Sequence, residues 1–198
     1  MLHANSLESA GSGGADGGPQ PLKGRAVLVT GAGGFIGSHV VERLAADGAK
    51  VRAFLRYNSR GDMGAMRFLP EELRESVECV FGDLRDGNAV REAVRGAEVV
   101  FHLGALIAIP YSYLHPREVV ETNVTGTLNV LMAAREMGTR RVVHASSSEV
   151  YGTALSEPMD ERHPLQGQSP YSASKIAADK LAESFHRSFD LPVVTVRP

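Results

Sequence analysis

The feature that most constrains this chain is a glycine-rich turn, residues 30–37, between an apolar run and an amphipathic segment. The apolar run covers residues 26–29 and the amphipathic segment covers residues 39–46, so the order predicts a strand, a tight turn and a helix. Glycine lets the backbone approach a pyrophosphate closely, and the first N–H groups of the helix point toward it with the positive end of the helix dipole. A dinucleotide is the natural ligand of such a turn.

The glycines of this turn are spaced as G-x-x-G-x-x-G, at Gly31, Gly34 and Gly37. Ile36 stands where the last glycine of the G-x-G-x-x-G pattern would be. We expect the three glycines, together with Phe35 and Ile36 in the first helical turn, to bind a cofactor. A βα turn that uses glycine for structural reasons alone is the alternative.

From Lys23 onward, short β-type runs alternate with helical patterns, which is typical of a parallel sheet covered by helices on both faces. The predicted strands are residues 26–30, 50–55, 77–81, 99–103, 141–145 and 193–197. The predicted helices are residues 34–47, 88–95, 117–137 and 171–189. We therefore expect an α/β fold with a doubly wound, Rossmann-like parallel sheet, whose ligands bind at the carboxyl ends of the strands.

Length and composition favour one cofactor-binding domain. The chain has 198 residues, 43% of them apolar, and residues 1–23 are a glycine-rich stretch that predicts a flexible leader before a domain of residues 24–198. A net charge of −2 argues against a nucleic-acid partner, and no apolar run is long enough to cross a membrane. The start lacks a signal-peptide pattern, and the single cysteine, Cys79, suggests neither a disulfide framework nor a metal site, so we expect a cytoplasmic location.

Basic residues follow the second predicted strand, where an NAD site usually places an acidic residue against the ribose 2′-hydroxyl. Arg56 occupies that position, and with Ser59 and Arg60 it can hold a 2′-phosphate by charge-assisted hydrogen bonds. This favours NADP over NAD; a solvated basic loop is the alternative, above all for Arg60. After the third strand, Asp83 is expected either to accept a hydrogen bond from the adenine amino group or to cap a helix.

Small and apolar residues at the ends of the third and fourth strands are expected to lie beside the cofactor. They are Leu84, Leu103, Gly104 and Ala105. His102, within the fourth strand, is interpreted as a packed strand residue rather than a catalyst.

Hydroxyl groups, a carboxylate and a Tyr–Lys pair follow the fifth strand. Ser147 and Glu149 lie directly after that strand, and Tyr171 and Lys175 open the last long helix. A spacing of four places Tyr171 and Lys175 on one helical face, where the ammonium group can stabilise a phenolate. Beside a hydride-accepting cofactor, such a tyrosine is the base that oxidation of an alcohol requires.

These motifs, together with residues 82–84, 123–127 and 196–198, resemble those of the extended short-chain dehydrogenases/reductases of the NAD-dependent epimerase/dehydratase family. The resemblance covers residues 24–198 and implies a nucleotide-sugar substrate. It implies that Tyr171 takes the proton of the sugar C4 hydroxyl, that Ser147 hydrogen-bonds the same oxygen, and that Lys175 holds the nicotinamide ribose and stabilises the phenolate.

Glu149 separates the branches of that family. Residues 147–152 are similar to the Thr-Asp-Glu or Thr-Ser-Glu signature of sugar-nucleotide 4,6-dehydratases, which implies that Glu149 removes the C5 proton. Ser148 departs from the dTDP-glucose type, whose aspartic acid protonates the leaving hydroxyl, so Glu149 itself is expected to supply that proton. The wider pattern is most similar to dehydratases of UDP-N-acetylglucosamine; a nucleotide-sugar 4-epimerase and a UDP-glucuronate decarboxylase are the alternatives.

The resemblance implies two further expectations. Family members continue into a carboxyl-terminal substrate domain, whereas this sequence stops at Pro198, so we expect a truncated protein with weak or no turnover; an inactive dinucleotide-binding module is the alternative from another class. Family members commonly form a homodimer through a four-helix bundle, built here from the helices predicted at 117–137 and 171–189. Apolar positions that fit such a bundle are Leu128, Val130, Leu131, Ile176, Leu181 and Phe185.

Overall fold

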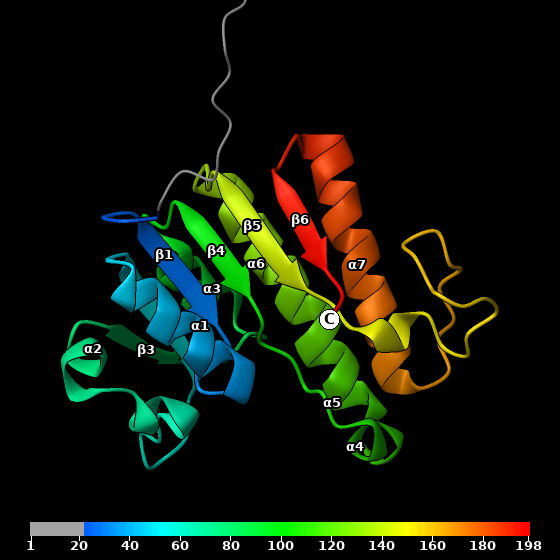
Figure 1. Cartoon of the computed structure of the whole chain (residues 1–198), viewed down its shortest axis with the longest axis horizontal. Helices are drawn as coiled ribbons and strands as arrows, with labels where there is room; N and C mark the ends of the chain where they lie inside the picture. Colours follow the sequence, from blue (N-terminus) through cyan, green and yellow to red (C-terminus); the bar gives the residue numbers. More distant parts are fainter. Residues whose placement is uncertain (1–21) are drawn as a thin grey trace, which may run out of the picture.

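Six parallel strands form one sheet in the order β3-β2-β1-β4-β5-β6 in the computed structural model, which describes residues 22–198 (Figure 1). The strands are β1 (Ala26–Thr30), β2 (Lys50–Arg56), β3 (Glu78–Gly82), β4 (Val99–His102), β5 (Arg141–Ala145) and β6 (Val193–Val196). The strand order changes direction between β1 and β4, so the predicted doubly wound, Rossmann-like sheet is confirmed. The predicted leader lies almost wholly outside the described residues.

The long helices follow the predicted ranges, except that one predicted helix is divided into three consecutive elements. The long ones are α1 (Phe35–Ala46), α3 (Gly87–Val94), α6 (Gly126–Glu136) and α7 (Pro170–Phe189). The helix predicted at 117–137 comprises α5 (Pro116–Val120), the π-helical turn η2 (Glu121–Thr125) and α6. Four short elements were not predicted, because a helical period cannot be read over so few residues. They are η1 (Gly64–Phe68), α2 (Glu71–Glu75), α4 (Ile109–Leu114) and η3 (Ser148–Val150).

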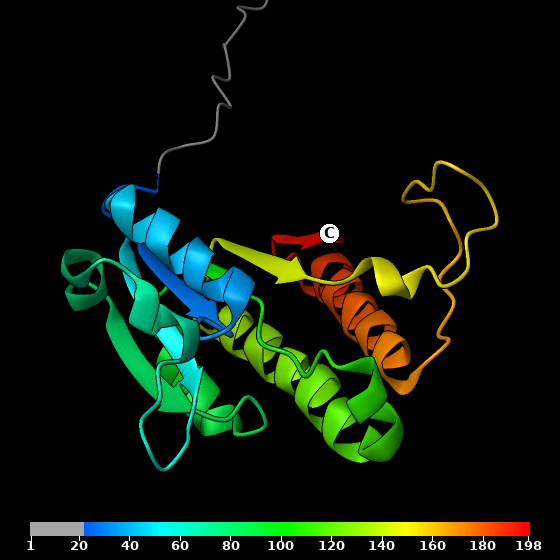
Figure 2. The same ribbon diagram turned by 60° about the horizontal axis from the view of Figure 1, so that its bottom comes forward.

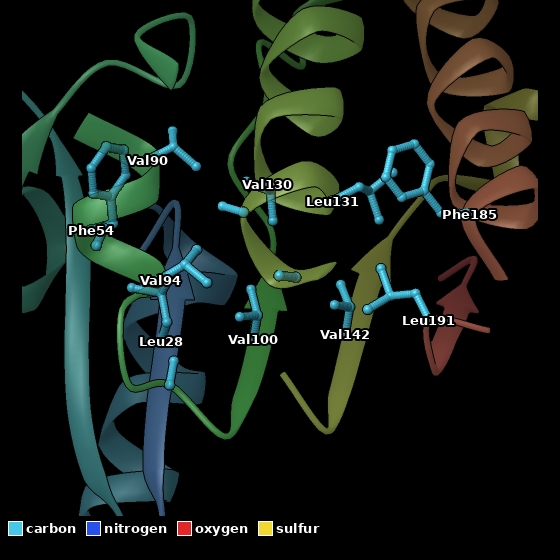
Figure 3. Packing of buried hydrophobic residues seen from close by; sticks show 14 of the residues in the cluster. Leu28, Phe54, Val90, Val94, Val100, Val130, Leu131, Val142, Phe185 and Leu191 are labelled. Atoms are coloured by element: carbon cyan, nitrogen blue, oxygen red, sulfur yellow. The ribbon is translucent and has the colours of Figure 1, made fainter. Parts of the chain in front are cut away.

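One face of the sheet packs against α3, α6 and α7 (Figure 3). Leu28, Val100 and Val142 lie side by side on β1, β4 and β5 and are fully buried in this cluster. Burying each of these side chains stabilises the fold by roughly 1.5–3 kcal/mol. Val130, Leu131 and Phe185 belong to the same core, so packing within the chain, rather than a partner helix, explains their apolar character.

The opposite face of the sheet is covered unequally. Helix α1 packs on the half formed by β1, β2 and β3, through residues such as Val41 and Leu44. Among the described residues, no helix lies over β4, β5 and β6 on this side, and Val194 and Val196 of β6 are 43% and 42% exposed (Figure 1). Figure 2 shows α1 on one side of the sheet and α6 and α7 on the other.

Within residues 22–198 no helix combines the length and the apolar character needed to cross a membrane. The carboxyl ends of the six parallel strands lie at one edge of the sheet. The glycine turn, the loop after β4 and the segment after β5 therefore meet there.

Candidate functional site

The turn between β1 and α1 brings the backbone of two strand ends into close contact. Gly31 has φ = +70°, and a Cβ atom there would lie 2.7 Å from the backbone nitrogen of Gly104. A Cβ atom at Gly37 would collide with the carbonyl oxygen of Gly31. Glycine at these two positions therefore allows a tight turn in which α1 begins directly beside the end of β4.

The first N–H groups of α1 lack partners within the helix, as at the start of any helix. Gly34, the residue that precedes the helix, supplies no side-chain cap for them. Phe35 and Ile36 form its first turn, and their side chains are 77% and 58% exposed. Since no side chain occupies the first N–H groups, this end of the helix suits the pyrophosphate of a dinucleotide.

A chain of hydrogen bonds fixes the backbone at the end of β4. Thr127 donates its hydroxyl hydrogen to the carbonyl oxygen of Asn123 (2.6 Å), so its oxygen accepts from Nε2 of His102 (3.0 Å). Nδ1 of His102 then accepts from the Thr30 hydroxyl (2.7 Å), and that oxygen accepts from the N–H of Gly104 (3.1 Å). Burial lowers the pKa of His102 well below its usual value, so the ring is neutral and packed, as interpreted from the sequence.

A cavity of about 120 Å³ opens between the ends of β1, β2, β3 and β4. Leu84, Gly104 and Ala105 line it as predicted, together with Gly31, Arg56 and Asp83. Its other lining residues are Gly82, which belongs to the motif of residues 82–84, and four that were not predicted, Phe54, Arg85, Leu106 and Thr122. Leu103 packs instead against the core under α1. Apolar walls with an arginine and a carboxylate at the rim fit the adenosine part of a dinucleotide.

Charged residues at the rim of this cavity are paired with one another. Asp83 accepts from Nε (3.0 Å) and Nη2 (2.6 Å) of Arg85, which lowers the pKa of Asp83. Asp86, not Asp83, caps α3, because its carboxylate accepts from the N–H groups of Asn88 and Ala89. The capping interpretation of Asp83 is therefore wrong.

Arg56 lies 3.4 Å from a carboxylate oxygen of Glu118 on α5. Glu118 also accepts a hydrogen bond from the hydroxyl of Tyr111. Ser59 and Arg60 lie in the exposed turn after β2 and are not among the residues that line the cavity. Of the three residues proposed for a 2′-phosphate, Arg56 ends β2 and lines the cavity, whereas Ser59 and Arg60 follow the strand and do not line it.

The four predicted catalytic residues come from two segments that Lys175 joins. Its Nζ donates to the carbonyl oxygen of Ala145 (2.7 Å), the last residue of β5, so α7 is held against the end of that strand. Ser147 follows two residues later, and its hydroxyl accepts from the N–H of Glu149 (3.2 Å). Lys175 and Tyr171 are only 4% and 6% exposed, whereas Glu149 is exposed.

The start of α7 is defined by a capping box. Ser169 accepts from the N–H of Ser172, and the Ser172 hydroxyl accepts from the N–H of Ser169. Pro170 occupies the first turn, where its fixed φ suits a helix. This places Tyr171 in the first turn of α7 with defined geometry.

Asn123 connects the loop after β4 to α7. Its side-chain amide accepts from the N–H of Leu106 (2.7 Å) and donates to the Leu106 carbonyl (2.9 Å) and to the Ser174 hydroxyl (2.9 Å). It lies in the π-helical turn η2, and such turns are frequent at functional sites. Sequence reasoning assigned Asn123 to a motif but gave it no role.

Sequence reasoning also missed a largely buried polar cluster behind Lys175, formed by His144, Tyr151, Asp179 and Arg197. The spacing of four between Lys175 and Asp179 could have indicated it. The described residues hold no group of three or more His, Cys, Asp or Glu side chains arranged for a metal ion.

A doubly wound parallel sheet, a glycine turn at its switch point and a buried Tyr–Lys pair beside β5 define a class. They are the parts of a dinucleotide-binding domain of the short-chain dehydrogenase/reductase type.

Comparisons with known proteins agree with this class. A family model described as GDP-mannose 4,6 dehydratase matches residues 28–198. UDP-glucose 4-epimerase of Mycolicibacterium smegmatis is 36% identical over 173 residues, which is 86% of this chain and 54% of the relative. The chain belongs to the GDP-mannose 4,6 dehydratase family, within the extended short-chain dehydrogenases/reductases.

Two solved structures show the same fold. One is a dTDP-glucose 4,6-dehydratase from Streptomyces venezuelae with NAD bound, at 35% identity and a TM-score of 0.79 over 87% of this chain and 55% of that chain. The other is a UDP-N-acetylglucosamine 4-epimerase from Methanobrevibacter ruminantium M1, at 32% identity and a TM-score of 0.80 over 88% of this chain and 55% of that chain. The present chain therefore spans about half the length of the relatives it matches.

Proposed function

We propose that this chain is the cofactor-binding part of a nucleotide-sugar 4,6-dehydratase that acts on UDP-N-acetylglucosamine and oxidises it transiently at C4. The observation that carries the proposal is the placement of Glu149, an exposed carboxylate directly after β5, beside Ser147 and next to the helix that bears Tyr171 and Lys175. A dehydratase requires a second base besides the tyrosine, and Glu149 supplies one.

Three side chains serve the oxidation step. Tyr171 takes the proton of the C4 hydroxyl, and Ser147 donates a hydrogen bond to the same oxygen. Lys175 stabilises by its charge the phenolate form of Tyr171 that acts as the base and, fixed to Ala145, keeps its position. A bound nicotinamide would accept the C4 hydride and later return it.

Glu149 serves the elimination step. The 4-keto group makes the C5 proton acidic, so a carboxylate can remove it, and the C6 hydroxyl then leaves. Because Ser148 cannot act as an acid at neutral pH, Glu149 returns the proton to that hydroxyl, which departs as water. C6 then receives the hydride that a bound nicotinamide would return, and C5 takes up the proton that Tyr171 took from the C4 hydroxyl, so the atoms balance with loss of one water from the sugar.

The cofactor is proposed to be NADP or NAD, with NADP favoured because of Arg56. The residues proposed to bind it are Gly31, Gly34, Phe35, Ile36, Gly37, Arg56, Ser59, Arg60, Asp83, Leu84, Leu103, Gly104, Ala105, Tyr171 and Lys175. Two observations stand against this preference. The similar dTDP-glucose 4,6-dehydratase structure holds NAD, and in this chain Arg56 is already paired with the carboxylate of Glu118. Titration calorimetry with both cofactors tests the preference: Arg56→Ala should weaken NADP at least about tenfold and leave NAD nearly unchanged.

The activity is tested by mass spectrometry of UDP-N-acetylglucosamine after incubation with the protein and either cofactor. Loss of one water that Tyr171→Phe and Glu149→Gln both abolish is the expected result. Glu161→Gln, which removes an exposed carboxylate from the loop after β5, is the matched control and should leave the product unchanged. Persistence of water loss in Glu149→Gln would contradict the assigned base.

A 4-epimerase is the second candidate, since two of the similar proteins are described as epimerases. Unchanged mass with an inverted C4 centre would establish it and leave Glu149 with a structural role. Loss of carbon dioxide from UDP-glucuronate would indicate a decarboxylase instead. Retained cofactor with no product from any of these sugars would favour either a different substrate or the inactive dinucleotide-binding module.

We also propose a homodimer and a cytoplasmic location. The dimer would form through a four-helix bundle of α5–α6 and α7, whose surfaces carry exposed apolar residues such as Val120 and Met132. The location is supported by the single cysteine of the chain, Cys79, which leaves no possibility of an internal disulfide.

A further inference from the structure

A buried carboxylate lies one helical turn behind the buried lysine of the site. Lys175 and Asp179 are each 4% exposed and share one face of α7. The ammonium group of Lys175 donates to the Ala145 carbonyl, a neutral acceptor. A lysine in such surroundings needs a nearby negative charge to remain protonated.

Asp179 is fixed by groups from two strands. Its Oδ2 accepts from Nε of Arg197 after β6 (3.0 Å), and its Oδ1 lies 3.2 Å from Nε2 of His144 on β5. Burial by itself would raise the pKa of Asp179, but these contacts lower it below its usual value, so the group is a carboxylate at neutral pH. Arg197 also donates to the hydroxyl of Tyr151 (3.0 Å), two residues after Glu149.

The other groups that face Lys175 add no negative charge. His102 on β4 and His144 on β5 stack with ring centroids 5.6 Å apart. Burial lowers the pKa of both rings, and the Lys175 cation lowers them further, so both are neutral. Arg197 is a cation, and the η2 turn brings the neutral amide of Asn123 to α7.

We propose that Asp179 is a positioning residue that keeps Lys175 cationic at neutral pH and so allows Lys175 to stabilise the Tyr171 phenolate. The proposal rests on the proposed function in that Lys175 is taken as the group that acts on Tyr171. Arg197 holds the carboxylate in place from β6 and joins it to the segment that bears Glu149.

The charge balance gives the expected size of the effect. Burial lowers the pKa of Lys175 from its ordinary value to about 8, and Asp179 opposes that shift. A nearby opposite charge shifts a pKa by roughly 1–3 units, so removing the Asp179 charge, one helical turn away, should lower the pKa of Lys175. At least about half of the Lys175 side chains would then be neutral at pH 7 and unable to stabilise a phenolate.

The composition of the chain permits a direct test. It contains four lysines, Lys23, Lys50, Lys175 and Lys180, so protein labelled with ¹³C at lysine Cε gives few signals. The signal of Lys175 is identified by its loss in Lys175→Met, and its pKa is read from a pH titration of the 198-residue chain. Asp179→Asn should lower that pKa by at least about one unit, a tenfold change in the acid dissociation constant.

Glu183→Gln is the matched control, because Glu183 lies one turn further along α7 and pairs with Lys180 and Arg187. The pKa of Lys175 should not change in that variant. Equal pKa values in the wild type and in folded Asp179→Asn would overturn the proposal and leave Asp179 a structural role. Far-UV circular dichroism shows whether the variant is folded.

Arg197→Gln keeps the proposal testable if Asp179→Asn does not fold. This variant removes the cation that competes with Lys175 for the Asp179 carboxylate, while α7 and the contact with His144 keep that carboxylate in place. The pKa of Lys175 should therefore rise; an unchanged or lower pKa would contradict the proposal. The lysine titration needs neither cofactor nor sugar. A chain without dehydratase activity can therefore still confirm or overturn the role of Asp179.

Discussion

At the residue scale, the space around Gly37 decides whether the cofactor turn can form. A methyl group at Gly37 would collide with the Gly31 carbonyl, whereas one at Gly34 would meet its nearest atom at 3.3 Å. We expect Gly37→Ala to destabilise the fold by about 1–3 kcal/mol and to weaken cofactor binding, with a much smaller effect for Gly34→Ala. Urea unfolding and cofactor titration measure both; equal effects in the two variants would contradict this packing.

The buried lysine makes stability depend on pH. The pKa of Lys175 is 10.5 ordinarily and about 8 in the fold, so between these pH values the unfolded chain binds more protons than the folded one. The free energy of unfolding therefore rises with pH across this window, and the cost of burying the cation applies in full below about pH 8.

Lys175→Met removes this dependence. Relative to the variant, the wild type should gain about 2–3 kcal/mol of unfolding free energy between pH 7.5 and pH 10.5. Chemical unfolding at the two pH values measures this gain in unfolding free energy. Lys180→Met, which removes an exposed lysine of the same helix, is the control, and the wild type should show no such gain relative to it. A constant difference between the wild type and Lys175→Met would show that Lys175 titrates normally.

Residue spacing predicted part of the candidate site. Lys175 and Tyr171 are four apart on one helix, and Gly31 follows a strand, so local rules sufficed for them. The pairing of Arg56 with Glu118 spans 62 positions, and no local pattern reports it. The hydrogen bonds from Arg85 to Asp83 were missed for another reason. Two charged residues close in the sequence do not show whether their side chains point toward each other.

At the element scale, the first turn of α7 positions Tyr171. Ser169→Ala removes the hydroxyl that caps this helix and should reduce the free energy of unfolding by about 1 kcal/mol. Ser184→Ala, near the far end of the same helix, removes a hydroxyl that bonds only to the Leu181 carbonyl one turn back and should have little effect. Equal losses in urea unfolding would mean that the cap does not stabilise α7.

Strands and long helices were predictable because each buries a periodic set of side chains. The ranges 26–30 and 141–145 match β1 and β5 in the structure. The break of the helix predicted at 117–137 was not visible, since a π turn adds one residue without changing the apolar character of the segment. The bonds that Asn123 makes to Leu106 and Ser174 fix this turn, and they depend on tertiary contacts.

At the scale of the whole molecule, the helices α5, α6 and α7 are the surface proposed for the homodimer. Met132 is 55% exposed on α6, and a carboxylate there would face the partner helix. Light scattering should give a dimer for the wild type and a monomer for Met132→Glu. Leu155→Glu changes an exposed residue of the loop after β5 in the same way and should remain dimeric. A monomeric wild type would contradict the dimer.

Among residues 22–198, helices cover one face of the sheet only in part. Val194 of β6 is paired in register with Val143 of β5, and Val143 is paired with Phe101 of β4. The three residues therefore lie on the face of the sheet whose other half, formed by β1, β2 and β3, is covered by α1. An apolar row of this kind is normally buried between layers. The chain also spans about half the length of its relatives, so their full activity is here a proposal.

One measurement tests the proposed C4 oxidation most directly. UDP-N-acetylglucosamine carrying deuterium at C4 is incubated with the protein and cofactor, and the position of the label in the product is read by NMR. A 4,6-dehydratase transfers the label within the molecule, so we expect deuterium in the new C6 methyl group and none after Tyr171→Phe. Deuterium that remains at C4 of a dehydrated product would contradict the proposed mechanism, and deuterium at an inverted C4 would show an epimerase.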